Sequence, residues 1–214
     1  MKRGFTLIEL LIVIAIILIL IAIALPNFLE AQVRAKVARV SADMRTIVTA
    51  LESYQVDWQT YPPDHDPTVT ETGQKGLFQL TTPLPYLKAL PNDAFIQPNS
   101  GLERDEEGFE YNSTGQPLSQ AHRLPPIGHV VAYLLHSHGP NGEDDCDGNN
   151  SWPFCDRGNS CDPTHHSGGR CGCMTYSPTN GSKSGGELIE MGGQWRSGSW
   201  CLDGWQYIKG KWMF

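Results

Sequence analysis

The amino-terminal part of the chain is almost continuously hydrophobic. Residues 5–25 contain only two polar side chains, those of Thr6 and Glu9, and the last sixteen residues of the run are all apolar. A helix of this length would measure about 31 Å, enough to cross the hydrocarbon core of a bilayer. Two positive residues, Lys2 and Arg3, precede the run. We therefore predict a membrane-spanning helix whose amino-terminal side faces the cytoplasm.

Beyond this run the pattern changes to a single apolar stripe. Apolar residues recur at steps of four and three at Val33, Val37, Val40, Met44, Ile47, Leu51 and Tyr54. This spacing predicts that the helix continues as an amphipathic stem, kinked or loosened at Pro26. The helix should end near Trp58–Tyr61, because Pro62 and Pro63 cannot continue it. A coiled coil would show the same stripe, but we favour packing on the chain's own sheet, because short strands that need a partner follow.

The remainder of the chain has the pattern of a small, loop-rich domain. Short helices are predicted near Leu77–Leu80 and Pro85–Leu90. Strands are predicted at Phe109–Asn112, His129–His136, Glu187–Met191 and Trp205–Ile208. The fold class is therefore α+β. A long amino-terminal helix, transmembrane in one half and amphipathic in the other, packs on a small antiparallel sheet, and the carboxy-terminal region is loop-rich and contains disulfides.

Charge narrows the choice of partners. The chain has 214 residues with 16 Lys and Arg against 23 Asp and Glu, a net charge of −7. Most of the negative charge lies after the helix, where residues 59–214 carry 10 basic and 18 acidic groups. A nucleic acid needs a basic surface, so we expect no nucleic-acid partner.

An ordinary secretory signal peptide would explain the apolar run, with a cleavage site at Ala22-Ile23-Ala24. Two features argue against it. The run leads directly into the amphipathic helix, with no polar cleavage region between them. Glu9 also lies inside the run, where a carboxylate costs roughly 2.5–3.5 kcal/mol on insertion scales and so needs a partner or a role.

The segment Gly4-Phe5-Thr6-Leu7-Ile8-Glu9-Leu10 resembles the class III signal of type IV pilins and type II secretion pseudopilins. In that family a prepilin peptidase cuts after the glycine and methylates the new amino terminus. The resemblance implies cleavage after Gly4, N-methylation of Phe5 and an assembly role for Glu9, and Pro26 matches the family's helix-kinking proline. The Phe5 amino group of one subunit would pair with Glu9 of a neighbour, which offsets the desolvation of both charges and fixes the axial register.

The same resemblance implies the partners and the location. The chain would polymerise with itself through the amino-terminal helices, and it would meet prepilin peptidase, minor pseudopilins and an inner-membrane assembly platform. It would sit in the bacterial inner membrane with its head in the periplasm, assembled into a periplasmic or surface fibre.

Two further segments resemble the major pseudopilins of type II secretion and favour that branch over a true pilus. The first is the Y-x-x-D-x-x-x-Y-P pattern of Tyr54–Pro62, and the second is Gly76–Leu80 followed by Tyr86–Asp93. We divide the chain into a leader (1–4), an assembly helix (5–25), a stem (26–60), a head (61–148) and a cysteine-rich extension (149–214).

Oxygen-bearing side chains concentrate in one turn after a predicted strand, at Asn141, Asp144, Asp145, Asp147 and Asn149. Hard cations such as Ca²⁺ take six to eight oxygen ligands, and such a turn can supply several of them. Asp145, Asp147, Asn149 and Asp156 fall at positions 1, 3, 5 and 12 of an EF-hand-like loop, although Asn150 stands where glycine is expected. Major pseudopilins resemble this segment in having a calcium-binding loop after a strand. We predict bound Ca²⁺, the alternative being a solvated acidic turn.

All six cysteines lie in the last third of the chain: Cys146, Cys155, Cys161, Cys171, Cys173 and Cys201. No Cys-x-x-Cys pair is present, which makes a zinc ribbon a poor match. In a periplasmic head disulfides are expected. Six cysteines permit 15 pairings, and the sequence does not choose among them.

The histidines and the aromatic tail give no catalytic pattern. His136 and His138 share a predicted strand face, and we expect the histidines to lie on the surface. The sequence contains no His-Glu-x-x-His, Gly-x-Ser-x-Gly or phosphate-loop motif. We therefore predict that the protein is not an enzyme, and that the aromatic residues near the carboxy terminus are core rather than a binding patch.

These observations favour a structural subunit, a pseudopilin that polymerises into a periplasmic pseudopilus and drives protein export. Two alternatives stay open: a type IV pilin of a surface pilus, and a membrane-tethered, calcium-dependent binding module that never polymerises.

Overall fold

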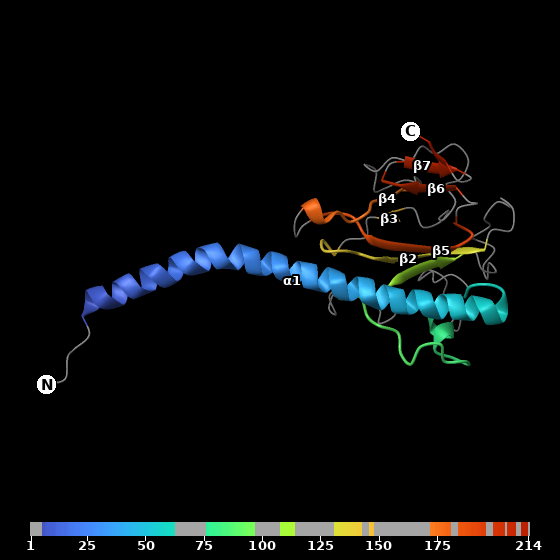
Figure 1. The fold of residues 1–214 in the computed structure, drawn as a ribbon, viewed down its shortest axis with the longest axis horizontal. Coiled ribbons are helices and arrows are strands. Elements are labelled where there is room, and N and C mark those ends of the chain that lie inside the picture. Colours follow the sequence, from blue (N-terminus) through green and yellow to red (C-terminus); the bar gives the residue numbers. More distant parts are fainter. Residues whose placement is uncertain are drawn as a thin grey trace.

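The computed structural model describes residues 6–62, 76–96, 108–113, 131–142, 146–147, 172–180, 184–195, 199–203, 205–208 and 211–213. One helix, α1 (Leu7–Trp58), is far longer than the head it supports (Figure 1). It runs through Pro26 without interruption and bends gently, so the predicted kink is at most a curve. It ends at Trp58, within the predicted range, and is capped by Gln59, whose backbone is left-handed (φ 60°).

The head is built on a three-stranded antiparallel sheet in the order β1-β2-β5. Its strands are β1 (Glu110–Ser113), β2 (Ala132–Ser137) and β5 (Leu188–Gly193). All three lie within a few residues of the predicted strands. Because β2 is central, it places Glu110 of β1 opposite His136 and Ile189 of β5 on the other side of the same histidine.

The main core lies between α1 and this sheet. Five residues of the predicted stripe, Val40, Met44, Ile47, Leu51 and Tyr54, are buried there. They meet Tyr111, Tyr133 and Leu135 from the sheet, and Leu77 and Leu80 from the 3₁₀ helix η1 (Gly76–Leu80). Side chains of β2 alternate between the two faces, so Ala132 and Leu134 join a second cluster on the far face with Trp195 and Leu202. The prediction that the stem packs on the chain's own sheet is confirmed.

A second sheet was not anticipated as a unit. It has five short strands in the order β3-β4-β6-β7-β8: β3 (Cys146–Asp147), β4 (Gly172–Cys173), β6 (Ser199–Leu202), β7 (Trp205–Ile208) and β8 (Lys211–Met213). The pairing of β4 with β6 is parallel and the others are antiparallel. Only β7 was predicted, and β3, β4 and β8 are too short to show an alternating pattern. A short 3₁₀ helix, η3 (Pro178–Asn180), precedes β5.

The helix predicted at Pro85–Leu90 is wrong. The segment is a series of bends. The Leu87 amide donates to the carbonyl of Leu80 (2.9 Å) instead of to a carbonyl four residues earlier. Tyr86, Leu87 and Leu90 pack against the main core. Contact with the core and a link to η1 therefore replace the local helical bonds.

Candidate functional site

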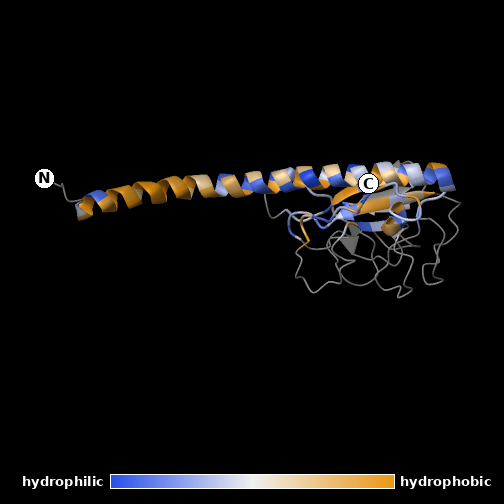
Figure 2. Ribbon diagram, turned by 90° about the horizontal axis from the view of Figure 1, so that it is seen from below, coloured by the Kyte–Doolittle hydropathy of each residue, from blue (hydrophilic) through white to orange (hydrophobic). Residues whose placement is uncertain are grey.

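The amino-terminal half of α1 has no protein covering it. Large apolar side chains of this apolar half, which we define as Leu7–Leu29, are between 46% (Val13) and 81% (Leu7) exposed. Figure 2 shows the apolar half as a mostly hydrophobic rod that projects away from the head. Its most hydrophobic window has a mean hydropathy of 3.4 and none of it is buried, which makes α1 long and apolar enough to cross a membrane by length and composition. Such a surface is stable in a bilayer or against other apolar helices, and not in water.

The start of α1 is a capping box formed by Thr6 and Glu9. The Thr6 amide donates to Glu9 Oε2 (2.8 Å), and the Thr6 hydroxyl donates to the same oxygen (2.7 Å). In return the Glu9 amide donates to Thr6 Oγ1 (3.3 Å). The single charge of the apolar half is therefore held at the end of the helix, next to the predicted cleavage point. A carboxylate is stabilised there by the positive end of the helix dipole.

The carboxy-terminal end of α1 is fastened to the head by the residues of the Y-x-x-D-x-x-x-Y-P pattern. The Tyr54 hydroxyl donates to Gln79 in η1 (2.8 Å), and Asp57 accepts from the Tyr86 hydroxyl (2.7 Å). The Pro62 carbonyl accepts from the Tyr111 hydroxyl of β1 (3.0 Å). The pattern thus makes a rigid joint between stem and head, and these residues have a structural role.

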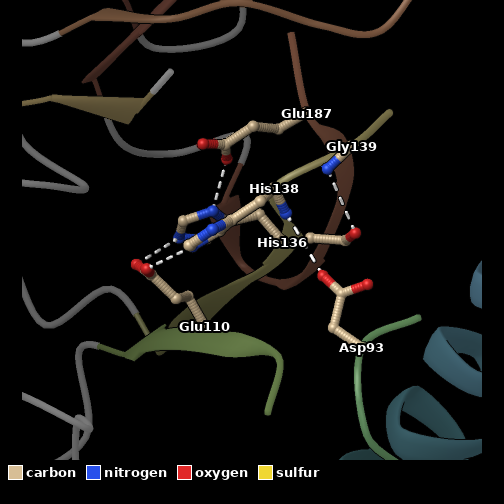
Figure 3. Close-up of polar contacts among 7 residues, drawn as sticks. Asp93, Glu110, His136, His138, Gly139 and Glu187 are labelled. Atoms are coloured by element: carbon tan, nitrogen blue, oxygen red, sulfur yellow. Dashed lines mark hydrogen bonds and ion pairs between the residues drawn. The ribbon is translucent and has the colours of Figure 1, made fainter. Parts of the chain in front are cut away.

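A cluster of charged groups lies inside the head, at one end of the three-stranded sheet (Figure 3). His136 of β2 is fully buried, and its two ring nitrogens face two carboxylates. Nδ1 pairs with Glu187, which is also buried, and Nε2 lies 3.3 Å from Glu110. Glu110 also bonds the ring of His138 (2.8 Å). The expectation that the histidines lie on the surface is wrong for His136, because the sheet register brings two acids to it.

These contacts decide the charge of the histidine. Burial by itself lowers the pKa of His136, but the carboxylates of Glu187 and Glu110 raise that pKa well above 6.5. Burial by itself raises the pKa of Glu110, but hydrogen bonds from His136 and His138 bring that pKa below its usual range. His136 is therefore an imidazolium held between two carboxylates near neutral pH.

The same end of the sheet is tied to the loop that follows η1. Asp93, which is buried, accepts from the His138 amide (3.2 Å) and from the Phe95 amide (2.9 Å). Glu110 and Glu187 were not recognised from the sequence, because each stands alone with no motif around it. Asp93 ends the Tyr86–Asp93 segment of the family resemblance, but the sequence assigned it no role. Among the residues that the structure describes, no group of three or more His, Cys, Asp or Glu could hold a metal ion.

Most of the other predicted site residues lie outside the described residues. This applies to Gly4 and Phe5, to Asp144, Asp145 and Asn149, and to Cys155, Cys161 and Cys171. Asn141 and Gly142 lie in a turn closed by a bond from the Gly142 amide to the Gly139 carbonyl (3.1 Å). Cys146 of β3 stands opposite Cys173 of β4 in the backbone register, and Cys201 lies in β6. The calcium loop and the disulfides stay predictions.

Comparison with known proteins gives two family matches along the chain. Residues 1–25 match the prokaryotic N-terminal methylation motif, and residues 27–117 match protein G of the type II secretion system. The chain is 30% identical over 142 residues to type II secretion system core protein G of Escherichia coli K12, covering 66% of this chain and 84% of the relative. The chain belongs to the type II secretion system protein G family.

Other relatives show over how much of the chain the sequence similarity extends. The core protein G of Dickeya chrysanthemi is 28% identical over 146 residues, 68% of this chain and 82% of that protein. The type IV major pilin protein PilA of Myxococcus xanthus is 52% identical, but over only 53 residues, 25% of this chain and 24% of that protein. No solved structure matches the chain. The match to the protein G family model ends at residue 117, before β2, but the alignment to the Escherichia coli relative covers 66% of this chain and therefore includes β2.

Proposed function

We propose that this protein is a pseudopilin, a structural subunit that polymerises through α1 into a pseudopilus of a type II secretion system. Its apolar half would anchor it in the bacterial inner membrane before assembly, and its head would face the periplasm. The observation that carries the proposal is the uncovered apolar half. The apolar half has 23 residues and carries one carboxylate near its amino-terminal end. When it leaves the bilayer and packs against the apolar halves of other copies, its apolar surface stays away from water, so the transfer costs little free energy.

Glu9 gives the proposed assembly its specificity. Within a single chain its carboxylate has Thr6 as its partner. Cleavage after Gly4 would create a methylated amino group on Phe5, directly before Thr6. In a low-dielectric fibre core, that amino group on one copy and Glu9 on the next would compensate each other, while an unpaired charge there would be strongly destabilising. Prepilin peptidase, minor pseudopilins and an assembly platform are the partners that this route requires, and a bound Ca²⁺ in the loop after β2 is part of the proposal.

Replacing Glu9 by alanine tests the proposal. We expect Glu9→Ala to abolish fibre formation and secretion in a strain that carries the secretion machinery, because a neighbour's amino group loses its partner. The matched control is Glu30→Ala, which removes a second glutamate of α1 that also bonds within the helix, to Arg34 (2.5 Å). Fibres should be counted by immunoblotting of sheared material, and secretion by the activity of exported proteins in the medium.

Two results would contradict the proposal. Normal fibre yield from Glu9→Ala would remove Glu9 from assembly. Absence of fibres from the unaltered chain in a complete secretion strain would remove the pseudopilin function itself.

A type IV pilin is the second candidate, favoured by the 52% identity to PilA along the amino-terminal segment. The two functions share the assembly helix and differ in where the fibre ends. Deletion of the gene separates the two functions. Loss of surface fibres with unimpaired protein export would favour the pilin. Loss of protein export, in a strain whose unaltered cells carry no surface fibres, would favour the pseudopilin.

A further inference from the structure

A groove runs along the stem where α1 enters the head. One wall is formed by α1 between Arg34 and Met44, and the other by Glu187–Glu190 at the start of β5 together with Thr175–Pro178. Its volume is about 470 Å³, and it is open to solvent. Helix residues in its wall are Arg34, Val37, Ala38, Ser41 and Met44. The groove begins five residues beyond the apolar half, on the same helix.

The lining of the groove is mainly apolar, and two of the three charged side chains that line it among the described residues are already paired. The third is the half-exposed Glu190 of β5. The apolar lining residues of the groove include Val37, Ala38, Leu188 and Ile189. Arg34 at the rim pairs with Glu30 one turn earlier. The carboxylate of Glu187 turns away to His136 in the interior of the head (Figure 3). A hydrophobic occupant would therefore meet no unpaired charge from these two residues.

A second copy of the chain supplies an apolar occupant for the groove, because every copy carries the same uncovered apolar half. Copies that pack side by side through these halves can be shifted along the fibre axis. A shift of about 21 Å, which is fourteen residues of helix, aligns the middle of residues 21–29 on one copy with the middle of residues 34–44 on another. Without the groove, the exposed Phe28 and Leu29 of the shifted copy would lie against a polar, charged stem.

We propose that this groove, defined by Arg34–Met44 and Leu188–Ile189, is the docking site for residues Ile21–Leu29 of α1 from a second copy of the chain. The contact is heterologous, because the groove of one copy meets a different surface of the other, and a heterologous contact that does not close produces an open filament. The groove extends the apolar path of the fibre core past the end of each apolar half. The inference rests on the proposed pseudopilin function and adds to it a contact between the helix of one copy and the head of another.

Crosslinking between two marked copies tests the contact. One copy carries Ser41→Cys in the groove and a distinguishable tag, and the other carries Phe28→Cys. The two are expressed together at full length in a strain that assembles the fibre, and intact fibres are oxidised. A disulfide forms only when two Cα atoms approach within about 7 Å. The matched control replaces Ser41→Cys with Ala42→Cys, the next residue of α1, which is exposed and does not line the groove.

We expect a mixed-tag adduct from the Ser41 and Phe28 pair and its loss in the Ala42 and Phe28 pair. Copies with only one of the two changes report the background from native cysteines. A second measurement uses Ser41→Trp, which fills the groove, and we expect it to abolish fibres while Ala42→Trp assembles and both heads keep the melting temperature of the unaltered chain. Equal adduct yields at positions 41 and 42, or normal fibres from Ser41→Trp, would overturn this contact while leaving the proposed function intact. Failure of the unaltered chain to form fibres would instead refute the proposed function.

Discussion

Replacing Glu187 by glutamine would remove one of the two carboxylates that hold the buried imidazole of His136. The change keeps the size of the side chain and its capacity for hydrogen bonding, so it isolates the effect of the charge. Glu187 and His136 are both fully buried, and Glu187 packs at the junction between residues 174–176 and the start of β5. We expect Glu187→Gln to be one of the most destabilising conservative substitutions in the head.

The magnitude follows from the burial of the pair. Removing one partner of a buried ion pair costs about 3–5 kcal/mol, because the other charge stays buried without compensation. Glu110 still lies 3.3 Å from His136 Nε2, so we expect the lower end, about 3 kcal/mol. For a domain of this size each kcal/mol lowers the melting temperature by about 2–4 °C, which predicts a decrease of about 6–12 °C.

The pH dependence of the free energy of unfolding provides an independent test of the same ion pair. The pKa of His136 is raised in the folded state above the 6.5 of the unfolded chain. The stabilisation is therefore complete below about pH 6.5, and it is lost as the pH rises through the folded pKa. The free energy of unfolding of the unaltered head should fall with rising pH in that interval, by up to about 1.4 kcal/mol per pH unit. Glu187→Gln should flatten this slope, because the folded pKa of His136 moves back towards 6.5.

The assay is thermal and urea unfolding of residues 26–214, from pH 5 to pH 9, with and without the substitution. Omission of residues 1–25 should leave the head folded, because residues 7–25 are exposed and contribute nothing to either core. Glu190→Gln, which changes a half-exposed glutamate of β5 three residues later, is the matched control and should change stability by no more than about 0.5 kcal/mol. A Glu187→Gln head as stable as this control, or an unaltered head whose stability is flat between pH 6.5 and 9, would refute the reasoning.

Three further predictions concern features that the family resemblance implies. Protein extracted from membranes should have lost residues 1–4 and gained one methyl group on Phe5; an intact mass with any other amino terminus would contradict processing at this site. Reduction should destabilise the head by about 2–4 kcal/mol for each lost disulfide. The register of β3 and β4 favours Cys146–Cys173 as one pair. Peptide mapping that finds six free thiols in periplasmic protein would reject the disulfides. If Ca²⁺ binds only the folded head, a hundredfold excess over its dissociation constant adds about 2.7 kcal/mol to the free energy of unfolding. Chelator should then lower the melting temperature, and Asp145→Ala should remove that response. Identical melting temperatures with and without chelator would instead indicate a solvated acidic turn.

The sequence alone determined the assembly helix. An apolar run of this length, a stripe at helical spacing and a proline pair at its end are local patterns, and the structure has α1 ending at Trp58 as expected. The strands β1, β2 and β5 were also located within a few residues, since alternation and turn residues are local as well. The resemblance around Gly4–Leu10 gave the family, which the comparisons confirm.

Only the tertiary structure decided what surrounds each strand. His136 became a buried cation because the register places Glu110 of β1 opposite it and the entry into β5 brings Glu187 from 51 residues away. No periodicity in the sequence carries that information, because pairing depends on which strands become neighbours and in what alignment. The segment at residues 85–90 lost its expected helix for the same reason, since contacts with the main core replaced local hydrogen bonds. The groove beside the stem likewise exists because α1 and β5, separated by more than a hundred residues, lie against each other with apolar side chains between them left partly uncovered.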